Sequence, residues 1–237
     1  NFYLESDKMK WALKACDLGL KQYEYSTDLI ADKAEILTRT GRLSEAISCI
    51  DAALIYAPSD VDLLMQKGSL HTISGEYLSS VACFKKILPM SEDRDEILYQ
   101  IGMAYQGLED FEKAIETYKE AIQFNLNNES VLYELTYCLE IMGTLEKSIP
   151  YYKRFIDADP YSEYAWYNMG IVYNKLKKFN KAIDAYEFSI AIDETFSSAH
   201  FNMGNTYLNL EKYDKAIASY LLTLEYEGPS PELYCHI

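Results

Sequence analysis

The chain has 237 residues, of which 49% are hydrophobic and 25% charged, and its formal net charge is −15 at pH 7. This charge argues against nucleic acid as a partner, because binding to phosphates requires a basic face that releases counterions. The sequence contains no apolar run long enough to span a bilayer, so we expect no membrane-spanning segment.

Residues 1–26 carry the apolar spacing of one helix, with Met9, Leu13, Cys16 and Leu20 on one face. From residue 27 onward, a pattern of two helices joined by a turn recurs six times with a period of 34 residues. The positions in residues 1–26 match those of a second helix in this pattern. We therefore expect residues 1–26 to hold the back half of a preceding repeat.

The six repeats follow one another without insertion or deletion, and residues 231–237 match the start of a further first helix. So strict a period indicates that each copy is one structural unit stacked on its neighbours, and that residues 1–237 form a single array. The predicted repeats are 27–60, 61–94, 95–128, 129–162, 163–196 and 197–230.

The fifth repeat shows the two helices most clearly. Trp166, Met169, Gly170 and Tyr173 recur at the spacing of one helical face. A second stripe begins at Phe179 and predicts the second helix. Its further members are Ala182, Ile183, Tyr186 and Ile190.

Two columns of small residues predict close contact between the helices of a pair. One column holds glycine in four repeats, with Ala34 and Thr136 in the other two. Glycine within a helix costs about 1 kcal/mol relative to alanine, so four glycines at one position need a packing reason. We expect each glycine to face the second helix of its own repeat. The glycines are Gly68, Gly102, Gly170 and Gly204, and the other small column is Ala46, Ser80, Ala114, Ser148, Ala182 and Ala216.

Three columns of larger residues fill the remaining space, and we expect all of them to be buried. The first opens each second helix. It holds Leu43, Tyr77, Phe111, Leu145, Phe179 and Tyr213. The other two are Ile47, Val81, Ile115, Ile149, Ile183 and Ile217, and Ile50, Phe84, Tyr118, Tyr152, Tyr186 and Tyr220.

This pattern resembles the tetratricopeptide repeat (TPR) over almost the whole chain, and residues 157–205 look most like bacterial cytosolic members of unassigned role. The resemblance implies an all-α, right-handed superhelical solenoid of stacked antiparallel helix pairs. It also implies a scaffold for protein–protein interaction, with the first helices on the concave face. Departures from the family pattern are local: Thr136 replaces glycine, and Ser80 and Ser148 replace alanine.

Residues that could support catalysis or bind a cofactor are scarce. His71 and His200 fall in apolar columns, so we expect both to be packed core residues, and no histidine has metal-ligand spacing to another ligand. The five cysteines lack the spacing of a zinc or redox site. We therefore expect free buried thiols, no cofactor, no metal, no enzymatic activity and a cytoplasmic protein.

The first helices contain a candidate binding surface one residue away from their core stripe. Aromatic side chains follow one column, and amides follow the next. Because an amide carries both a donor and an acceptor, this combination suits the backbone of an extended peptide. The alternative is that the tyrosines pack between repeats and the amides are merely solvated. The candidate groove residues are Gln66, Tyr99, Gln100, Tyr133, Tyr137, Tyr167, Asn168, Phe201, Asn202 and Asn205.

The partner expected from this surface is a protein or peptide of neutral to basic charge. The places where relatives carry Lys or Arg to grip a terminal carboxylate hold acidic or polar residues here, such as Asp28, Asp62 and Glu96. Two other functions remain open: the substrate-recognition part of a larger enzyme, and a sensor that changes shape on peptide binding. Self-association through the terminal repeats is also expected, around Leu4, Met9 and Leu13 at one end or around Leu222 and Tyr234 at the other.

Overall fold

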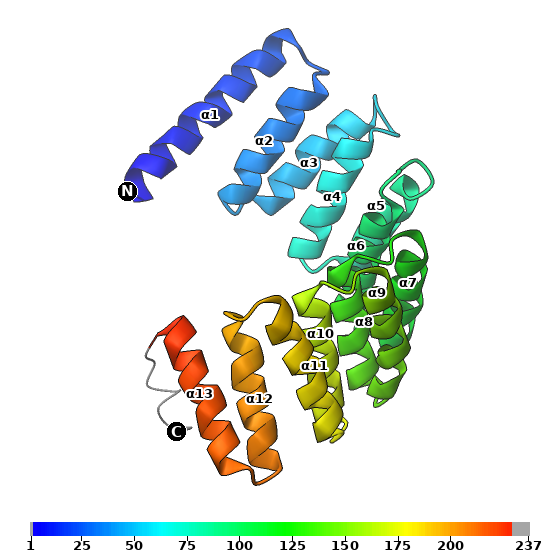
Figure 1. Ribbon diagram of the computed structural model, residues 1–237. Helices are drawn as coiled ribbons and strands as arrows, with labels where there is room; N and C mark the ends of the chain where they lie inside the picture. The colour runs from blue at the N-terminus through cyan, green and yellow to red at the C-terminus, as the bar shows by residue number, and fades with distance from the viewer. Residues whose placement is uncertain (1, 229–237) are drawn as a thin grey trace. The chain divides into compact units, whose positions relative to one another are not determined.

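A computed structural model describes residues 2–228, and within this range the chain forms α-helices and one 3₁₀ helix, with no strand (Figure 1). The prediction of an all-α repeat solenoid is confirmed. The chain divides into two compact units, the first ending at Phe124 and the second beginning at Asn125. The side chains of residues 2–7 and all of residues 229–237, including Tyr234, lie outside the described part.

The first unit contains α1 to α7. Their bounds are α1 Phe2–Gln22, α2 Thr27–Arg39, α3 Leu43–Leu54, α4 Val61–Ile73, α5 Tyr77–Ile87, α6 Arg94–Gly107 and α7 Phe111–Phe124. The second unit contains α8 to α13. Their bounds are α8 Glu129–Ile141, the 3₁₀ helix η1 Leu145–Ser148, α9 Ile149–Ala158, α10 Glu163–Lys175, α11 Phe179–Ile192, α12 Ser197–Asn209 and α13 Tyr213–Glu227.

Helices pack in the order of the sequence within each unit (Figure 1). Within a unit, a first helix contacts the second helix of its own repeat, as α10 contacts α11, and also a preceding second helix of the same unit, as α12 contacts α11. α1 packs against the first helix α2, so it occupies the position that the second helix of a preceding repeat would have. Among the described helices, none combines the length and the apolar character needed to cross a bilayer.

The start of each second helix follows the predicted column, with one difference in the fourth repeat. There Leu145 opens a 3₁₀ turn, and the α-helix begins only at Ile149. Pro150 lies in the first turn of α9, where its missing N–H is tolerated, but it cannot donate to the carbonyl of Glu146. An α-helix running through from Leu145 would need that bond, so the first turn tightens into a 3₁₀ helix.

The glycine column packs as predicted. A Cβ placed on Gly170 would lie 2.5 Å from the ring of Tyr186, and one on Gly102 would lie 2.3 Å from the ring of Tyr118. Both rings belong to the second helix of the same repeat, so the helices approach closely because the glycine has no side chain. Thr136 takes this place in the fourth repeat, and its hydroxyl lies 3.3 Å from the hydroxyl of Tyr152.

Of the three large columns that were expected to be buried, one is buried throughout, and the other two are mostly half-buried, with only Val81, Leu145 and Ile183 fully buried. The small column that includes Ala182 and the aromatic column that includes Tyr186 are buried in every repeat. The expectation was wrong for Tyr213 and Ile217 of the last repeat, whose exposed fractions are 60% and 37%. Tyr77, the counterpart of Tyr213 in the second repeat, lies against Gly107 of the following first helix α6, whereas no described helix follows α13.

Candidate functional site

The predicted groove residues of the first unit make contacts within the chain. The side-chain amide of Gln66 donates to the carbonyl of Ala31 on the preceding first helix at 3.0 Å. The Gln100 amide donates to Glu96 on its own helix at 2.9 Å. The ring of Tyr99 is half-buried and tilted against the ring of Tyr118, with 6.3 Å between their centroids. The donor groups of both amides are therefore engaged in this structure.

In the sixth repeat, the predicted residues are also engaged. Asn202 donates to the hydroxyl of Tyr167 at 2.8 Å, which ties two successive first helices together. The hydroxyl of Tyr220 donates to Asn205 at 2.8 Å. The ring of Phe201 packs against the ring of Tyr220. For these residues the alternative of packing between helices describes the geometry better than an open amide ladder.

The fourth and fifth repeats differ from this pattern. Tyr133 and Tyr137 on α8 expose 57% and 45% of their surface, more than their half-buried counterparts Tyr167 and Ile171. Asn168 on α10 is half-buried, and within residues 2–228 its side chain makes no hydrogen bond. An amide in this state retains both its donor and its acceptor for a ligand.

These three side chains line one cavity of about 210 Å³ within the second unit. Its remaining walls come from α8, α10 and the second helix of the fourth repeat, and they include Leu145, Tyr152 and Ile171. The cavity thus brings together Tyr133, Tyr137 and Asn168 of the predicted groove. It does not include the other predicted residues of this unit, Tyr167, Phe201, Asn202 and Asn205.

The charges around this cavity are balanced. Glu140 and Lys175, which both line it, form an ion pair with Nζ 2.5 and 2.7 Å from the two carboxylate oxygens. Burial raises the pKa of the Tyr152 hydroxyl, with a smaller opposing effect from its hydrogen bond to Thr136, so the phenol remains neutral. Burial also raises the pKa of Glu134, the neighbour of Tyr133 on α8.

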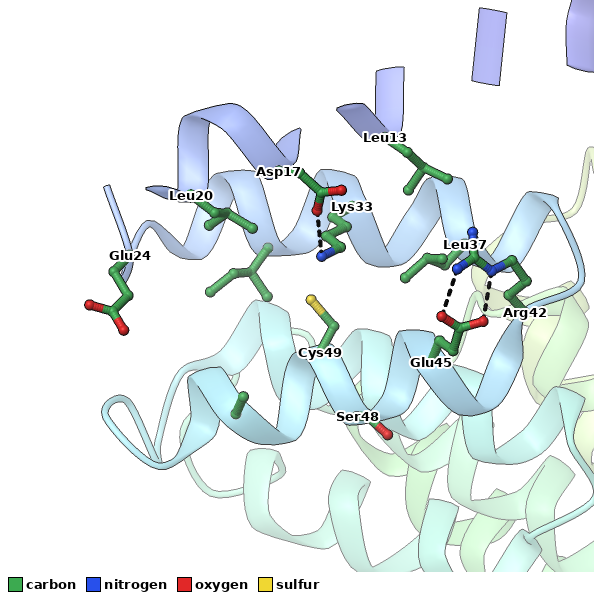
Figure 2. Close-up of a pocket in the computed structure, with 12 residues that line it drawn as sticks. Leu13, Asp17, Leu20, Glu24, Lys33, Leu37, Arg42, Glu45, Ser48 and Cys49 are labelled. Atoms are coloured by element: carbon green, nitrogen blue, oxygen red, sulfur yellow. Dashed lines mark hydrogen bonds and ion pairs between the residues drawn. The ribbon is translucent and has the colours of Figure 1, made fainter. Parts of the chain in front are cut away.

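A second and larger cavity of about 550 Å³ lies between α1, α2 and α3 in the first unit (Figure 2). Leucine side chains such as Leu13 and Leu20 line it, and Lys33 reaches from α2 to Asp17 on α1 with 2.7 Å between the charged atoms. The sequence interpretation assigned these leucines to core columns and did not predict a cavity here. The repeated spacing of Asp17 with Lys33 and of Asp51 with Lys67 was the available signal for the ion pair.

This second cavity offers little for chemistry. Its thiol, Cys49, lies among the lining side chains, and burial raises the pKa of that thiol, which lowers its reactivity. Four of its five charged groups form ion pairs, Lys33 with Asp17 and Arg42 with Glu45, the latter through two nitrogens at 2.7 and 2.6 Å. The cavity of the fourth and fifth repeats is therefore the better candidate for a binding site.

Residues that could catalyse or bind metal are dispersed in the structure. Across the described residues, no group of three His, Cys, Asp or Glu side chains is placed to hold a metal ion. His71 and His200 are buried, as predicted, with ring nitrogens 2.7 Å from the Glu76 carboxylate and 2.9 Å from the Glu194 carbonyl. The described cysteines, Cys16, Cys49, Cys83 and Cys138, carry free thiols, and Cys235 lies outside the described residues.

Comparison with known families identifies the repeats. Models of the tetratricopeptide repeat match residues 96–128 and 163–196, and a second model of the same repeat matches residues 197–227. No curated protein matches the chain significantly.

Solved structures share this fold. A crystal structure of MamA is 25% identical with a TM-score of 0.56, over 68% of this chain and 94% of that chain. YrrB, described as a TPR protein with an unusual peptide-binding site, is 20% identical with a TM-score of 0.55, over 79% of this chain and 96% of its own. A tetratricopeptide repeat protein from Parabacteroides merdae is 16% identical with a TM-score of 0.59, over 99% and 93% of the two chains. Such likeness concerns the fold.

Proposed function

Because the chain is a tetratricopeptide repeat protein, we propose that it is a scaffold that holds a peptide or an extended partner segment against its first helices. The observation that carries this proposal is the cavity that joins Tyr133, Tyr137 and Asn168. These side chains come from two successive first helices, and they combine exposed aromatic surface with an amide that has no partner within the described residues. Aromatic rings bind with little loss of conformational entropy, and an amide can pair with any peptide group.

Site-specific photocrosslinking tests the proposal. A photoreactive phenylalanine derivative in place of Tyr137 should crosslink a partner in the native cell, and mass spectrometry should place the crosslink in one short segment of it. The same derivative in place of Leu78, which is exposed on the second helix α5, serves as the matched control. Crosslinks that form at position 78 and not at position 137 would show that the partner binds elsewhere.

The partner of this proposal is neutral to basic in charge. The net charge of −15 repels acidic segments and attracts basic ones, so association with a basic partner should slow as the salt concentration rises. The two alternative functions make different predictions. A recognition part of a larger enzyme requires a catalytic domain in the same gene product, and a peptide-responsive sensor requires a change in small-angle scattering when peptide binds.

Self-association is a further part of the proposal, supported by the exposed side chains on α13. Tyr213, Ile217 and Leu221 follow one another at a spacing of four residues, so they lie on one helical face. Sedimentation at rising concentration should reveal dimers, and Ile217→Lys should suppress them. The free thiols are compatible with a reducing compartment, and we propose the cytoplasm as the location.

A further inference from the structure

The second unit contains two versions of the same joint between first helices, one closed and one open. In the closed version, three contacts hold the ring of Tyr167. Its centroid lies 6.1 Å from that of Tyr186 and 5.0 Å from that of Phe196, and its hydroxyl accepts a bond from Asn202. The ring is therefore fixed between the helices and fills the space there.

One period earlier, each of these contacts is lost. Tyr133 takes the place of Tyr167, and its counterpart contacts would come from Tyr152, Ser162 and Asn168. Ser162 is too small to pack on the ring, and the Asn168 amide makes no hydrogen bond within the described residues. No ring contact between Tyr133 and Tyr152 occurs in residues 2–228 either. Tyr133 is accordingly more exposed than Tyr167, and it lines the cavity between α8 and α10.

Thr136 explains part of this difference. At Gly170 the backbone lies directly against the ring of Tyr186, a contact that a Cβ would not permit. Thr136 places a side chain between α8 and Tyr152, and both residues line the cavity. Thr136, the residue that replaces glycine, therefore lies at the cavity between α8 and α10.

We propose that the fourth repeat determines specificity: its cavity takes one uncharged apolar side chain of the bound segment, while Asn168 pairs with the adjacent peptide group. This inference rests on the proposed function and names the chemistry that the site selects. The size of the cavity supports a single side chain, because its volume of about 210 Å³ is below the roughly 300–1,000 Å³ of pockets for whole small molecules.

The walls set the chemistry of that side chain. Leu145, Ile171 and Val172 contribute hydrocarbon side chains, and Tyr133 and Tyr137 contribute aromatic rings. The two charged residues at the cavity neutralise each other in the ion pair of Glu140 with Lys175. A charged side chain would lose its hydration here without gaining a free counter-charge, so it is disfavoured. An aromatic or branched aliphatic side chain has no charge whose hydration would be lost, and it buries apolar surface in the cavity.

The test uses random linear peptides displayed on phage and selected against the complete 237-residue chain. Selected peptides should share one aromatic or branched aliphatic residue, and replacing it with alanine should abolish binding. Thr136→Gly lets the Tyr152 ring approach α8 and narrows the cavity, so it should weaken binding about tenfold or more. Asn168→Ala removes both hydrogen bonds to the peptide group and should have an effect of similar size, about tenfold.

Matched controls separate binding from folding. Thr117→Gly makes the same change within a second helix, where the hydroxyl likewise bonds to the carbonyl four residues before, and Asn180→Ala removes an exposed amide. Both controls should leave peptide affinity unchanged by fluorescence anisotropy. If Thr136→Gly does not fold, Ile171→Trp fills the cavity from its wall and replaces it in the test.

The outcomes distinguish the two proposals. In one outcome, selected peptides lose affinity for Asn168→Ala but bind Thr136→Gly and Ile171→Trp as tightly as the natural chain. The cavity then does not select the side chain, so the present inference is wrong while the proposed function stands. If no peptide is selected, or if none responds to any change at Tyr133, Tyr137 or Asn168, the proposed function fails as well.

Discussion

The contact between a glycine and an aromatic ring defines the smallest repeated joint of this protein. Gly68, Gly102, Gly170 and Gly204 each lie against the ring of the second helix of their own repeat, at distances that exclude a Cβ. The ring in the fifth repeat, Tyr186, is fully buried and so has no room to move aside. The close packing at this joint therefore requires glycine, because any larger residue would collide with the ring.

Gly170→Leu should overpack the joint and lower the free energy of unfolding by about 1–3 kcal/mol or more. Urea denaturation followed by circular dichroism measures the change. Ala191→Leu, an exposed position of α11 in the same repeat, is the control and should change stability by less than about 0.5 kcal/mol. Equal stability of Gly170→Leu and the natural chain would contradict the helix pairing.

Glu134 provides a test of pH dependence at the same scale. Burial raises the pKa of this carboxyl, so the folded chain favours its protonated form. Its contribution to stability is then complete below the ordinary glutamate pKa and is lost as the pH rises through the raised value in the folded chain. Glu134→Gln, which imitates the protonated form, should melt at a higher temperature than the natural chain at neutral pH. This difference should vanish when the pH falls below the ordinary glutamate pKa, and a constant difference at all pH values would contradict the assignment.

The sequence predicted these residue contacts unequally. The packing of Gly170 on Tyr186 could be predicted because both positions are fixed by the helical period and by steric size. The amides were harder, because the period predicts the face on which Gln66, Asn168 and Asn202 lie but not where their flexible ends point. Gln66 donates to the Ala31 carbonyl and Asn202 donates to the Tyr167 hydroxyl, both on the preceding first helix, whereas Asn168 makes no such bond within the described residues.

At the scale of the element, a side-chain cap at the start of the helix is more frequent in first helices than in second helices. A side-chain oxygen at the N-cap bonds to the backbone in α2, α4, α8 and α10, through Ser26, Asp60, Asn128 and Ser162. The second helices α3, α5, α11 and α13 have no such bond in the described structure. The first helices α6 and α12 lack such a bond, and the second helix α7 has one, because the N–H of Lys113 donates to the Asp110 carboxylate at 3.2 Å. A side-chain cap is therefore more frequent in first helices, but it does not separate the two kinds of helix.

Ser162→Ala should destabilise the chain by about 1–2 kcal/mol. The hydroxyl of Ser162 accepts a bond from the N–H of Ala165 at 3.1 Å, and it also donates to Glu129 at 2.6 Å. Both Ser162 and Ala165 are buried, so water cannot replace the lost bond. Chemical denaturation measures the loss, with Ser130→Ala on the exposed surface of α8 as the control. A change as small as that of the control would mean that packing alone holds the start of α10.

Helix boundaries were largely predictable because the apolar columns mark them. In the fourth repeat the columns predicted the start of the helical segment but not its 3₁₀ conformation. The column placed Leu145 at the start of a second helix, and it does begin a helical segment. The 3₁₀ turn follows from Pro150, whose effect depends on the hydrogen bond that it cannot donate. The opening at Tyr133 has a similar origin, since Thr136 fits the repeat pattern as a small residue yet changes the geometry of its neighbours.

At the scale of the whole molecule, contacts are local. The main contacts of each helix are with elements of its own repeat or of an adjacent one, as expected for a stacked array. In such an array, stability is close to a sum of terms for single repeats and for neighbouring pairs. A change in one repeat should therefore affect that repeat and its neighbours, and have little effect several repeats away.

Amide hydrogen exchange of a destabilised variant tests this locality. Gly170→Leu should speed exchange in α10 and α11, and to a smaller extent in the adjacent α9 and α12, because the overpacked joint opens more often. Exchange in α2 to α5 should keep its natural rate, since these helices make their main contacts within their own part of the array. Mass spectrometry of peptic fragments resolves the two regions in one experiment. An equal loss of protection in α2 to α5 would show that the chain unfolds as one cooperative body, and the additive description of the array would then be wrong.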